Sequence, residues 1–233
     1  MKRKIGFLVA IEIDAVLEKY PNCRALDAPS GFRAYRIEES TCDLYVLRCG
    51  MGEIAAAAGA QYLITRFDVS LLFNFGVVGG LTADMSRHTL CVVERVVHYK
   101  YDCSEFLPLA VGQVDGHDSI FLPTDAKLLE TARTILPELT PVTCCSGDKF
   151  IGTQQEKQWL HDTFSGDICD MESAGIVLTC ETNGVPCLLF KAVSDGLAEG
   201  ADGFFASLQQ ASRTCFAAAE RMIRELPDNE NEA

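Results

Sequence analysis

Carboxylates stand directly after several apolar segments of this sequence, and carboxylates often move protons in enzymes. Glu12 and Asp14 follow the segment that begins at Ile5, and Asp195 follows the most apolar segment of the chain, Cys187–Val193. A buried carboxyl group can serve as a general acid, because burial favours its protonated form, and an ionised one can activate water. Asp195 could instead cap the next helix by accepting hydrogen bonds from its first N–H groups. The residues alone leave both roles open for Asp195.

A further carboxylate, Glu172, lies in Asp170-Met171-Glu172-Ser173-Ala174-Gly175, where a short strand is expected to turn into an apolar helix. A negative charge at this point is stabilised by the dipole of the helix that follows, which would be a purely structural role. A carboxylate also accepts hydrogen bonds from two hydroxyl groups at once, as the diol of a ribose requires. Glu172 is therefore a candidate for ribose binding, with the helix terminus as the alternative.

The segment Gly50–Ala55 matches the pattern G-x-G-x-x-[GA] of turns that bind dinucleotides between a strand and a helix. That motif also needs an acidic residue at the end of the next strand, which binds the ribose. Here the acidic residue near the right distance is Asp68, which precedes the next expected strand. We therefore expect no cofactor and interpret the glycines as allowing the backbone to approach a smaller ligand. A nicotinamide-dependent oxidoreductase is the distant alternative.

Short apolar segments alternate with amphipathic ones from one end of the sequence to the other, and this alternation predicts strands separated by helices. Most of the expected strands are apolar throughout, as in a mainly parallel sheet covered by helices on both faces. No linker or repeat interrupts the pattern, so we expect one domain over residues 1–226 and an acidic, disordered tail over residues 227–233. The expected strands are Ile5–Ile11, Leu44–Cys49, Leu71–Phe75, Leu90–Val97, Val142–Cys145 and Cys187–Val193, and the expected helices are Gly52–Arg66, Ala126–Leu136, Gln154–Phe164, Glu172–Asn183 and Asp202–Leu226.

The carboxyl ends of the expected strands are where a ligand binds in such a sheet. Polar residues and glycines follow five of the strands. Any one of these groups, taken alone, could simply form a turn, because turns favour such residues. Together they predict a crevice with several carboxylates around it. Phe150 follows one of these groups and is either a core side chain or a ring that stacks on a planar base. The five groups are Glu12 with Asp14, Gly50-Met51-Gly52, Gly76–Gly80, Ser146-Gly147-Asp148 and Ser194-Asp195-Gly196.

Composition excludes several classes of function. The chain has 233 residues and a formal net charge of −13, whereas a nucleic-acid-binding protein needs a basic surface. No apolar segment is long enough to span a membrane, and no signal-peptide cleavage site follows the apolar start. The 11 cysteines show no C-x-x-C spacing and no ligand spacing with the 4 histidines. We therefore expect free thiols, no metal and a cytoplasmic protein.

In their order along the chain, six segments resemble those of the purine nucleoside and uridine phosphorylase superfamily, and most closely those of methylthioadenosine/S-adenosylhomocysteine nucleosidases. The resemblance runs from Ile5 to about Met222, and its specificity lies in the ordered combination of segments. It implies a three-layer α/β/α fold with a mixed, mainly parallel central sheet. The segments are Ala10-Ile11-Glu12-Ile13-Asp14, Gly50-Met51-Gly52, Asn74–Leu81, Ser146–Ile151, Asp170-Met171-Glu172-Ser173-Ala174 and Val193-Ser194-Asp195.

The resemblance also implies which residues bind the substrate and which transfer protons. Phe150 would stack on the base, the backbone of Ile151 would read its edge, and Met171 and Glu172 would hold the ribose. By the same resemblance, the catalytic acid would be Asp195, at the end of the last apolar segment.

Asp195, oriented by Ser194, would protonate N7 of a purine as the bond between base and ribose breaks, in the manner of a glycosidase. In the hydrolases of the family a glutamate activates the attacking water, and its position aligns here with Asp14. Aspartate is one methylene shorter, so the water would have to lie closer or the nearby Glu12 would have to serve. Asp195, Asp14 and Glu12 are thus the catalytic candidates.

Val77 is a second departure from the family, because a serine at this position touches the water or the phosphate in the hydrolases and many phosphorylases. With no arginine cluster at the strand ends and only Arg48 nearby, hydrolysis is favoured over phosphorolysis. The expected function is hydrolysis of a 5′-modified adenosine such as methylthioadenosine or S-adenosylhomocysteine, in methionine salvage. The alternatives are a phosphate-dependent phosphorylase, a futalosine-type nucleosidase, and a nucleoside-binding protein with little turnover.

The segment His98–Asp102 lies where members of the family reach across a dimer interface. The alternative for this segment is an ordinary surface loop. The resemblance therefore predicts a homodimer that binds a small-molecule nucleoside and neither nucleic acid nor membrane.

Overall fold

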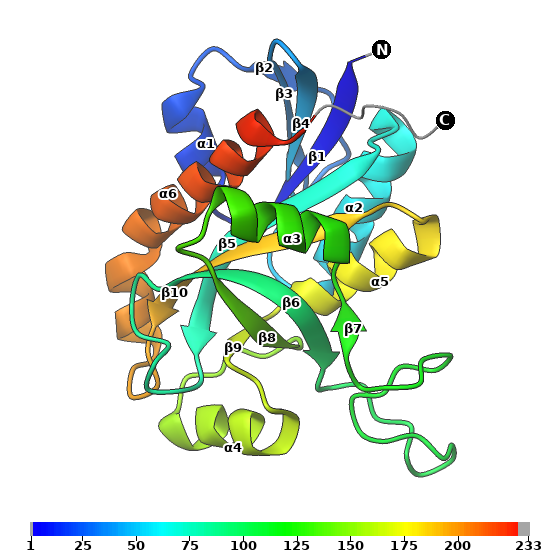
Figure 1. The fold of residues 1–233 in the computed structure, drawn as a ribbon, viewed down its shortest axis with the longest axis vertical. Coiled ribbons are helices and arrows are strands. Elements are labelled where there is room, and N and C mark those ends of the chain that lie inside the picture. Colours follow the sequence, from blue (N-terminus) through cyan, green and yellow to red (C-terminus); the bar gives the residue numbers. More distant parts are fainter. Residues whose placement is uncertain (1, 228–233) are drawn as a thin grey trace.

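The computed structural model describes residues 2–227, and its strands form a central sheet with helices packed on both sides (Figure 1). Except for Pro227, the expected acidic tail lies outside the described residues. The strands are β1 (Arg3–Val9), β2 (Arg24–Leu26), β3 (Arg33–Glu38), β4 (Cys42–Arg48), β5 (Leu71–Gly80), β6 (Leu90–His98), β7 (Leu122–Pro123), β8 (Thr140–Ser146), β9 (Ile168–Asp170) and β10 (Cys187–Asp195). The helices are α1 (Ile13–Lys19), α2 (Glu53–Phe67), α3 (Ala126–Ile135), α4 (Gln154–Phe164), α5 (Ser173–Asn183) and α6 (Ala201–Glu225).

The strand order is β10-β6-β8-β9-β5-β1-β4-β3-β2, and β10 also pairs with β5. The central pairings of β4 with β1, β1 with β5 and β5 with β10 are all parallel. Antiparallel pairings of β9 with β5 and of β6 with β10 make the sheet mixed, so the expected fold is confirmed. Because β9 joins β8 to β5, the strands β5, β9, β8, β6 and β10 close into a ring that the sequence pattern did not predict.

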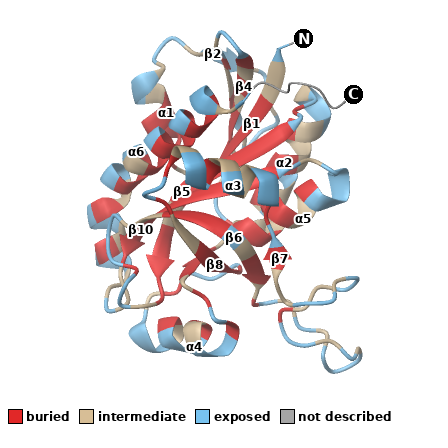
Figure 2. Ribbon diagram, viewed as in Figure 1, coloured by how far each residue is buried: buried red, intermediate tan, exposed pale blue. Residues whose placement is uncertain are grey.

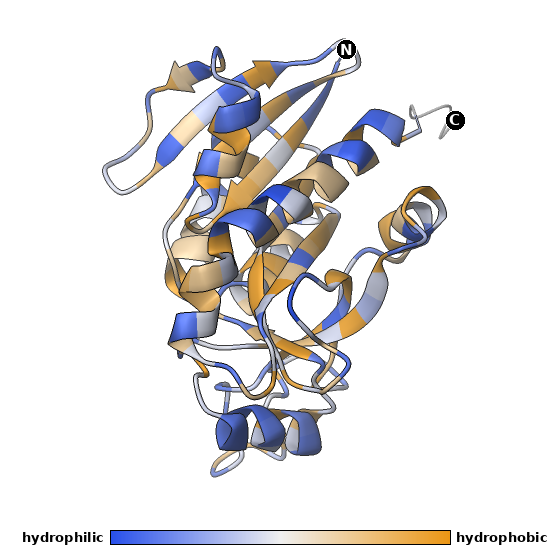
Figure 3. Cartoon of the chain, turned by 90° about the vertical axis from the view of Figure 1, so that its left-hand side faces the viewer, coloured by the Kyte–Doolittle hydropathy of each residue, from blue (hydrophilic) through white to orange (hydrophobic). Residues whose placement is uncertain are grey.

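Two apolar cores fill the two faces of the sheet, and Figure 2 shows the strands largely buried. On one face, Phe7 and Phe75 pack against Phe216 of α6, with ring centroids 6.0 Å and 5.1 Å from it. Each such ring, once buried, stabilises the fold by about 1.5–3 kcal/mol. Helices α2 and α5 cover the other face, and the outer sides of the helices are mostly hydrophilic (Figure 3).

Two strands, β5 and β10, extend past their predicted ends into the site. β5 includes Gly76–Gly80, which we expected as a turn, and β10 continues to Asp195. A Cβ atom on Gly79 would lie 3.1 Å from Cys169 Sγ and 3.4 Å from Asp195 Oδ2. Glycine is therefore used here for close approach within the sheet, because a side chain would collide with those of the neighbouring strands.

Candidate active site

A cavity opens at the carboxyl ends of β1, β5, β9 and β10, where the sequence places its crevice. It holds about 580 Å³ of empty space, counted together with the solvent at its opening. The residues that line it are Ala10, Ile11, Glu12, Met51, Val77, Val78, Gly79, Lys149, Phe150, Ile151, Cys169, Asp170, Met171, Glu172, Asp195 and Phe204.

Glu12 enters the cavity from the turn between β1 and α1 and is 6% exposed. Its Oε1 accepts a hydrogen bond from the backbone N–H of Val77 at 3.2 Å, and its Oε2 accepts one from Ile11 at 2.9 Å. A Cβ atom on Gly76 would lie 3.2 Å from Glu12 Oε1, so the glycine leaves room for the carboxylate against β5. Two backbone donors therefore fix Glu12 at the cavity wall, where it could hold a water molecule.

Asp14 lies in the first turn of α1, is exposed, and is not among the residues that line the cavity. Its neighbours Ile13 and Ala15 are buried on the core side of the helix, so Asp14 points toward solvent. The structure thus separates Asp14 from the other candidates, whereas Glu12, considered as its substitute, lies in the cavity.

A buried ion pair joins β9 to β10 beside the carboxylates. Lys191 Nζ lies 2.8 Å from Asp170 Oδ2, and both side chains are at most 2% exposed. Burial alone would raise the pKa of Asp170, but the Lys191 ammonium and hydrogen bonds from Ser173 hold that pKa below its ordinary value. Burial alone would lower the pKa of Lys191, but the Asp170 carboxylate keeps it above its ordinary value. The pair is therefore ionised, and Lys191 adds a fixed positive charge to this part of the site.

Glu172 directly precedes α5 and makes no capping hydrogen bond to it with its side chain. Its Oε1 accepts a hydrogen bond from the backbone N–H of Gly52 at 2.9 Å, and its Oε2 accepts one from Met171 at 3.2 Å. Burial and, after it, the neighbouring Asp170 carboxylate raise the pKa of Glu172 to about 7, against the opposing effect of the Lys191 ammonium. Near neutral pH Glu172 can therefore either donate or accept a hydrogen bond with a hydroxyl group.

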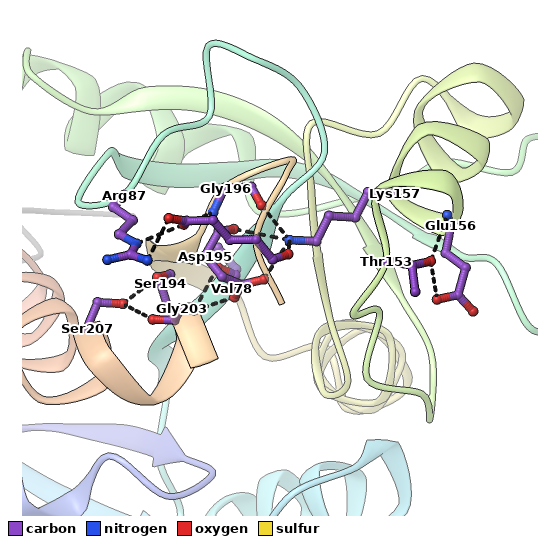
Figure 4. Close-up of polar contacts among 11 residues, drawn as sticks. Val78, Arg87, Thr153, Glu156, Lys157, Ser194, Asp195, Gly196, Gly203 and Ser207 are labelled. Carbon is purple, nitrogen blue, oxygen red and sulfur yellow. Dashed lines mark hydrogen bonds and ion pairs between the residues drawn. The ribbon is translucent and has the colours of Figure 1, made fainter. Parts of the chain in front are cut away.

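Asp195 ends β10, lines the cavity and is 1% exposed. Ser194 Oγ lies 2.8 Å from Asp195 Oδ1 and 3.1 Å from the carbonyl oxygen of Val78. Asp195 Oδ2 accepts a hydrogen bond from Lys157 Nζ at 2.6 Å, and Figure 4 shows Lys157 reaching from α4 toward it. Ser194 does not line the cavity, so its effect on a ligand would act through the orientation of Asp195.

Phe150 and Ile151 lie on the loop between β8 and α4, and both line the cavity. The Phe150 ring is 44% exposed and packs edge-to-face against Phe204 of α6, with centroids 5.8 Å apart. Ile151 is buried, and Met171 lines the cavity near Glu172. The exposed ring gives the cavity a flat apolar surface, on which a planar base can stack.

Sequence reasoning missed the two buried lysines of the site. Lys191 carried a signal, because it is the one charged residue in the apolar segment Cys187–Val193, and a buried charge needs a partner. Lys157 carried no such signal, because the segment Gln154–Phe164 is rich in polar residues. In a segment of this kind, the sequence pattern does not distinguish a buried lysine from one exposed to solvent.

Within residues 2–227, no group of three or more His, Cys, Asp and Glu side chains could hold a metal ion. In the same part of the chain, no helix is both long enough and apolar enough to cross a membrane.

The chain is similar to known proteins along almost its whole length. A family model described as Phosphorylase superfamily matches residues 4–226. The chain is 27% identical over 199 residues to 5′-methylthioadenosine/S-adenosylhomocysteine nucleosidase of Hydrogenovibrio crunogenus, covering 82% of this chain and 85% of the relative. It is 31% identical over 157 residues to aminodeoxyfutalosine nucleosidase of Campylobacter jejuni, covering 65% of this chain and 67% of the relative.

A solved structure of the Helicobacter pylori 5′-methylthioadenosine/S-adenosylhomocysteine nucleosidase superimposes on the chain with a TM-score of 0.90. The two are 26% identical, and the match covers 96% of this chain and 99% of that chain. That structure contains a ligand in which a 4-amino-pyrrolo[3,2-d]pyrimidine is joined to a pyrrolidin-3-ol with a thioether substituent.

Proposed function

Because the chain belongs to the phosphorylase superfamily, we propose that it is a nucleosidase that hydrolyses the N-ribosidic bond of a 5′-modified adenosine, such as methylthioadenosine or S-adenosylhomocysteine. One observation carries this proposal: the cavity holds the buried carboxyl group of Asp195 together with the carboxylates of Glu12 and Glu172. An acid is needed where the base leaves, and carboxylates are needed where positive charge grows on the sugar.

The spacing of these groups along β5 agrees with such a reaction. Glu12 contacts β5 at Gly76 and Val77, and Asp195 lies against it at Gly79. Three residues of an extended strand span about 10 Å. This distance leaves room for a purine base and its ribose between the acid and the residue that holds the water.

The proposed reaction moves one proton at each end of the breaking bond. The electron pair of the C1′–N bond goes to the base, and Asp195 transfers its proton to N7 of that base. The oxygen of a water molecule bonds to C1′, and the released proton goes to Glu12. Phe150 stacks on the base, the backbone of Ile151 reads its edge, and the ribose lies against Glu172 and Met171.

Val77 and the charges of the cavity support hydrolysis over phosphorolysis. At Val77 the backbone N–H remains as a donor, but the side chain has no hydroxyl for a phosphate. Of the residues that line the cavity in the described part of the chain, Lys149 is the one cation and none is an arginine. A phosphate dianion would also face the carboxylate of Glu12, while Asp170 is already paired with Lys191.

A futalosine-type substrate is the second candidate, because the chain is 31% identical to an aminodeoxyfutalosine nucleosidase.

We further propose a cytoplasmic homodimer of single-domain subunits, with a role in methionine salvage if methylthioadenosine is the substrate. Met51 and Ile54, exposed at 64% and 82% near the cavity, support the dimer, which light scattering after size-exclusion chromatography would test.

The proposed function is tested by incubating the purified protein with methylthioadenosine, S-adenosylhomocysteine, aminodeoxyfutalosine, adenosine and inosine. Base release is followed by chromatography with and without phosphate. Release without phosphate is the expected result, and the compound released fastest identifies the substrate. Release that requires phosphate would establish a phosphorylase, and saturable binding with no release would establish a nucleoside-binding protein.

A further inference from the structure

Lys157 is a fully buried lysine that reaches from α4 to the end of β10. Its Nζ lies 2.6 Å from Asp195 Oδ2, 2.7 Å from the carbonyl oxygen of Gly196 and 3.0 Å from that of Glu199. Asp195 itself is at most 2% exposed. These acceptors surround an ammonium group with three protons to donate, so the site is built for the charged form of lysine.

The same lysine connects the two loops that flank the cavity. α4 begins directly after the loop that carries Phe150, and Gly196 and Glu199 belong to the loop between β10 and α6. Lys157 therefore fixes the position of Asp195 relative to the Phe150 ring, on which the base stacks in the proposed function.

We propose that Lys157 is the positioning residue of the catalytic acid: its ammonium orients Asp195 and stabilises the carboxylate that Asp195 becomes when it gives its proton to the base. This inference rests on the proposed function. A carboxyl group buried without a partner holds its proton tightly, because the charged form is poorly solvated. The ammonium of Lys157, 2.6 Å from Asp195 Oδ2, offsets this effect by stabilising the carboxylate that forms. In the transfer, the O–H bond of Asp195 breaks and an N–H bond forms on the base, while Lys157 keeps all of its protons.

Other charged or titratable groups also lie around Asp195. Cys169 of β9 faces it across Gly79, and burial raises the pKa of its thiol above the ordinary value, so the thiol is neutral. On the α6 side, Glu199 is paired with Arg87, with 2.6 Å between Arg87 Nη2 and Glu199 Oε1. Glu199 is thus neutralised by Arg87, and among residues 2–227 the ion pair at the Asp195 carboxylate is the one with Lys157.

The test uses the whole chain, with the aspartate side-chain carboxyls labelled with carbon-13. The Asp195 resonance is identified by its loss in Asp195→Asn, and its pH titration is compared in the parent, Lys157→Met and Lys157→Arg. An opposite charge within about 4–6 Å changes the titration of a carboxyl group by about 1–3 pH units. We therefore expect Asp195 to stay protonated to a pH about 1–3 units higher in Lys157→Met, and Lys157→Arg to stay near the parent.

A second neutral variant, Lys157→Gln, provides the same test if Lys157→Met does not fold. Its side-chain amide can still donate hydrogen bonds to the carbonyl oxygens of Gly196 and Glu199. Lys4→Met is the matched control, since it removes a lysine from a surface ion pair with Asp68. If the protein is a nucleosidase, kcat falls as pH rises and Asp195 loses its proton. The pH at which kcat has fallen by half should be higher in Lys157→Met and Lys157→Gln than in the parent, by the same number of pH units as the titration of Asp195.

An Asp195 titration unchanged by the two neutral substitutions would overturn the proposal, as would a shift in Lys157→Arg as large as in Lys157→Met. The titration requires no turnover. If the parent protein releases no base from any nucleoside, the proposed function fails, and the titration still decides what Lys157 does.

Discussion

The carboxylate of Glu12 accepts a hydrogen bond from the backbone N–H of Val77 at 3.2 Å, which joins the end of β1 to β5 inside the cavity. Because the donor is a backbone group, the contact does not depend on which side chain stands at position 77. Asp14, the other candidate for this role, lies instead on the exposed side of α1. The structure therefore favours Glu12 as the residue that activates water.

Glu12→Gln should lower kcat by about 10²- to 10⁴-fold, the usual contribution of a general base. Asp14→Asn should leave kcat within about threefold of the parent, since the side chain is exposed and removed from the cavity. Base release at saturating substrate measures both. Equal losses in the two variants, or a loss confined to Asp14→Asn, would return the role to Asp14.

Phe150→Ala should raise KM about 5-fold or more, because stacking of a base on an aromatic ring is worth about 1–3 kcal/mol. Phe150→Tyr keeps the ring and should stay near the parent. Initial rates over a range of substrate concentrations separate KM from kcat. An unchanged KM in Phe150→Ala would mean that the base does not bind on this ring.

The alternation of the longer strands and helices and the family could be predicted from the sequence, and the match over residues 4–226 confirms the family. Periodicity identified the apolar strands and the capped helices, since these depend on local patterns. The edge strands β2 and β3 and the helix α1 were missed, as was β7, which has 2 residues. The short strand expected before Glu172 is β9, which has 3 residues and whose bounds were not predicted. Elements this short carry too few residues for a periodic signal.

Contacts between distant segments could not be predicted in the same way. The partner of Lys157 is Asp195, far along the chain, and the partner of Lys191 is Asp170. A sequence pattern reports which faces are apolar, but which buried charges meet depends on the packing of α4 and β9 against β10. The exposure of Asp14 depends likewise on where α1 begins.

Lys191→Met should destabilise the fold by about 3–5 kcal/mol, because it leaves the Asp170 carboxylate buried without its partner. The double variant Lys191→Met/Asp170→Asn should recover much of this loss, since neither charge then remains. Urea unfolding of the two single variants, the double variant and the parent gives the coupling energy. Additive effects would show that Lys191 and Asp170 do not depend on each other.

The folding stability of the protein should depend on pH through Glu172. Its pKa is raised from 4.5 to about 7 in the folded protein, so between these values the native state binds more protons than the unfolded state. Stability is therefore lost as pH rises through this window, by about 3 kcal/mol at about 1.4 kcal/mol per unit of pKa.

Glu172→Gln removes this penalty, so its stability relative to the parent should increase from pH 5 to pH 8. Urea unfolding at several pH values measures the difference, with the exposed Glu130→Gln as a control. A difference that stays constant with pH would show that Glu172 is not held in its protonated form by burial.

The most direct test concerns the proposal that Asp195 transfers a proton to the leaving base. Asn has nearly the shape of Asp but cannot supply an acidic proton, so Asp195→Asn isolates the proton transfer from binding. The measurement is base release from methylthioadenosine in phosphate-free buffer, together with calorimetric titration of the same variant with the same nucleoside. The account predicts that Asp195→Asn binds the nucleoside and that kcat falls by at least about 10²-fold. Release of base at the rate of the parent protein would contradict it.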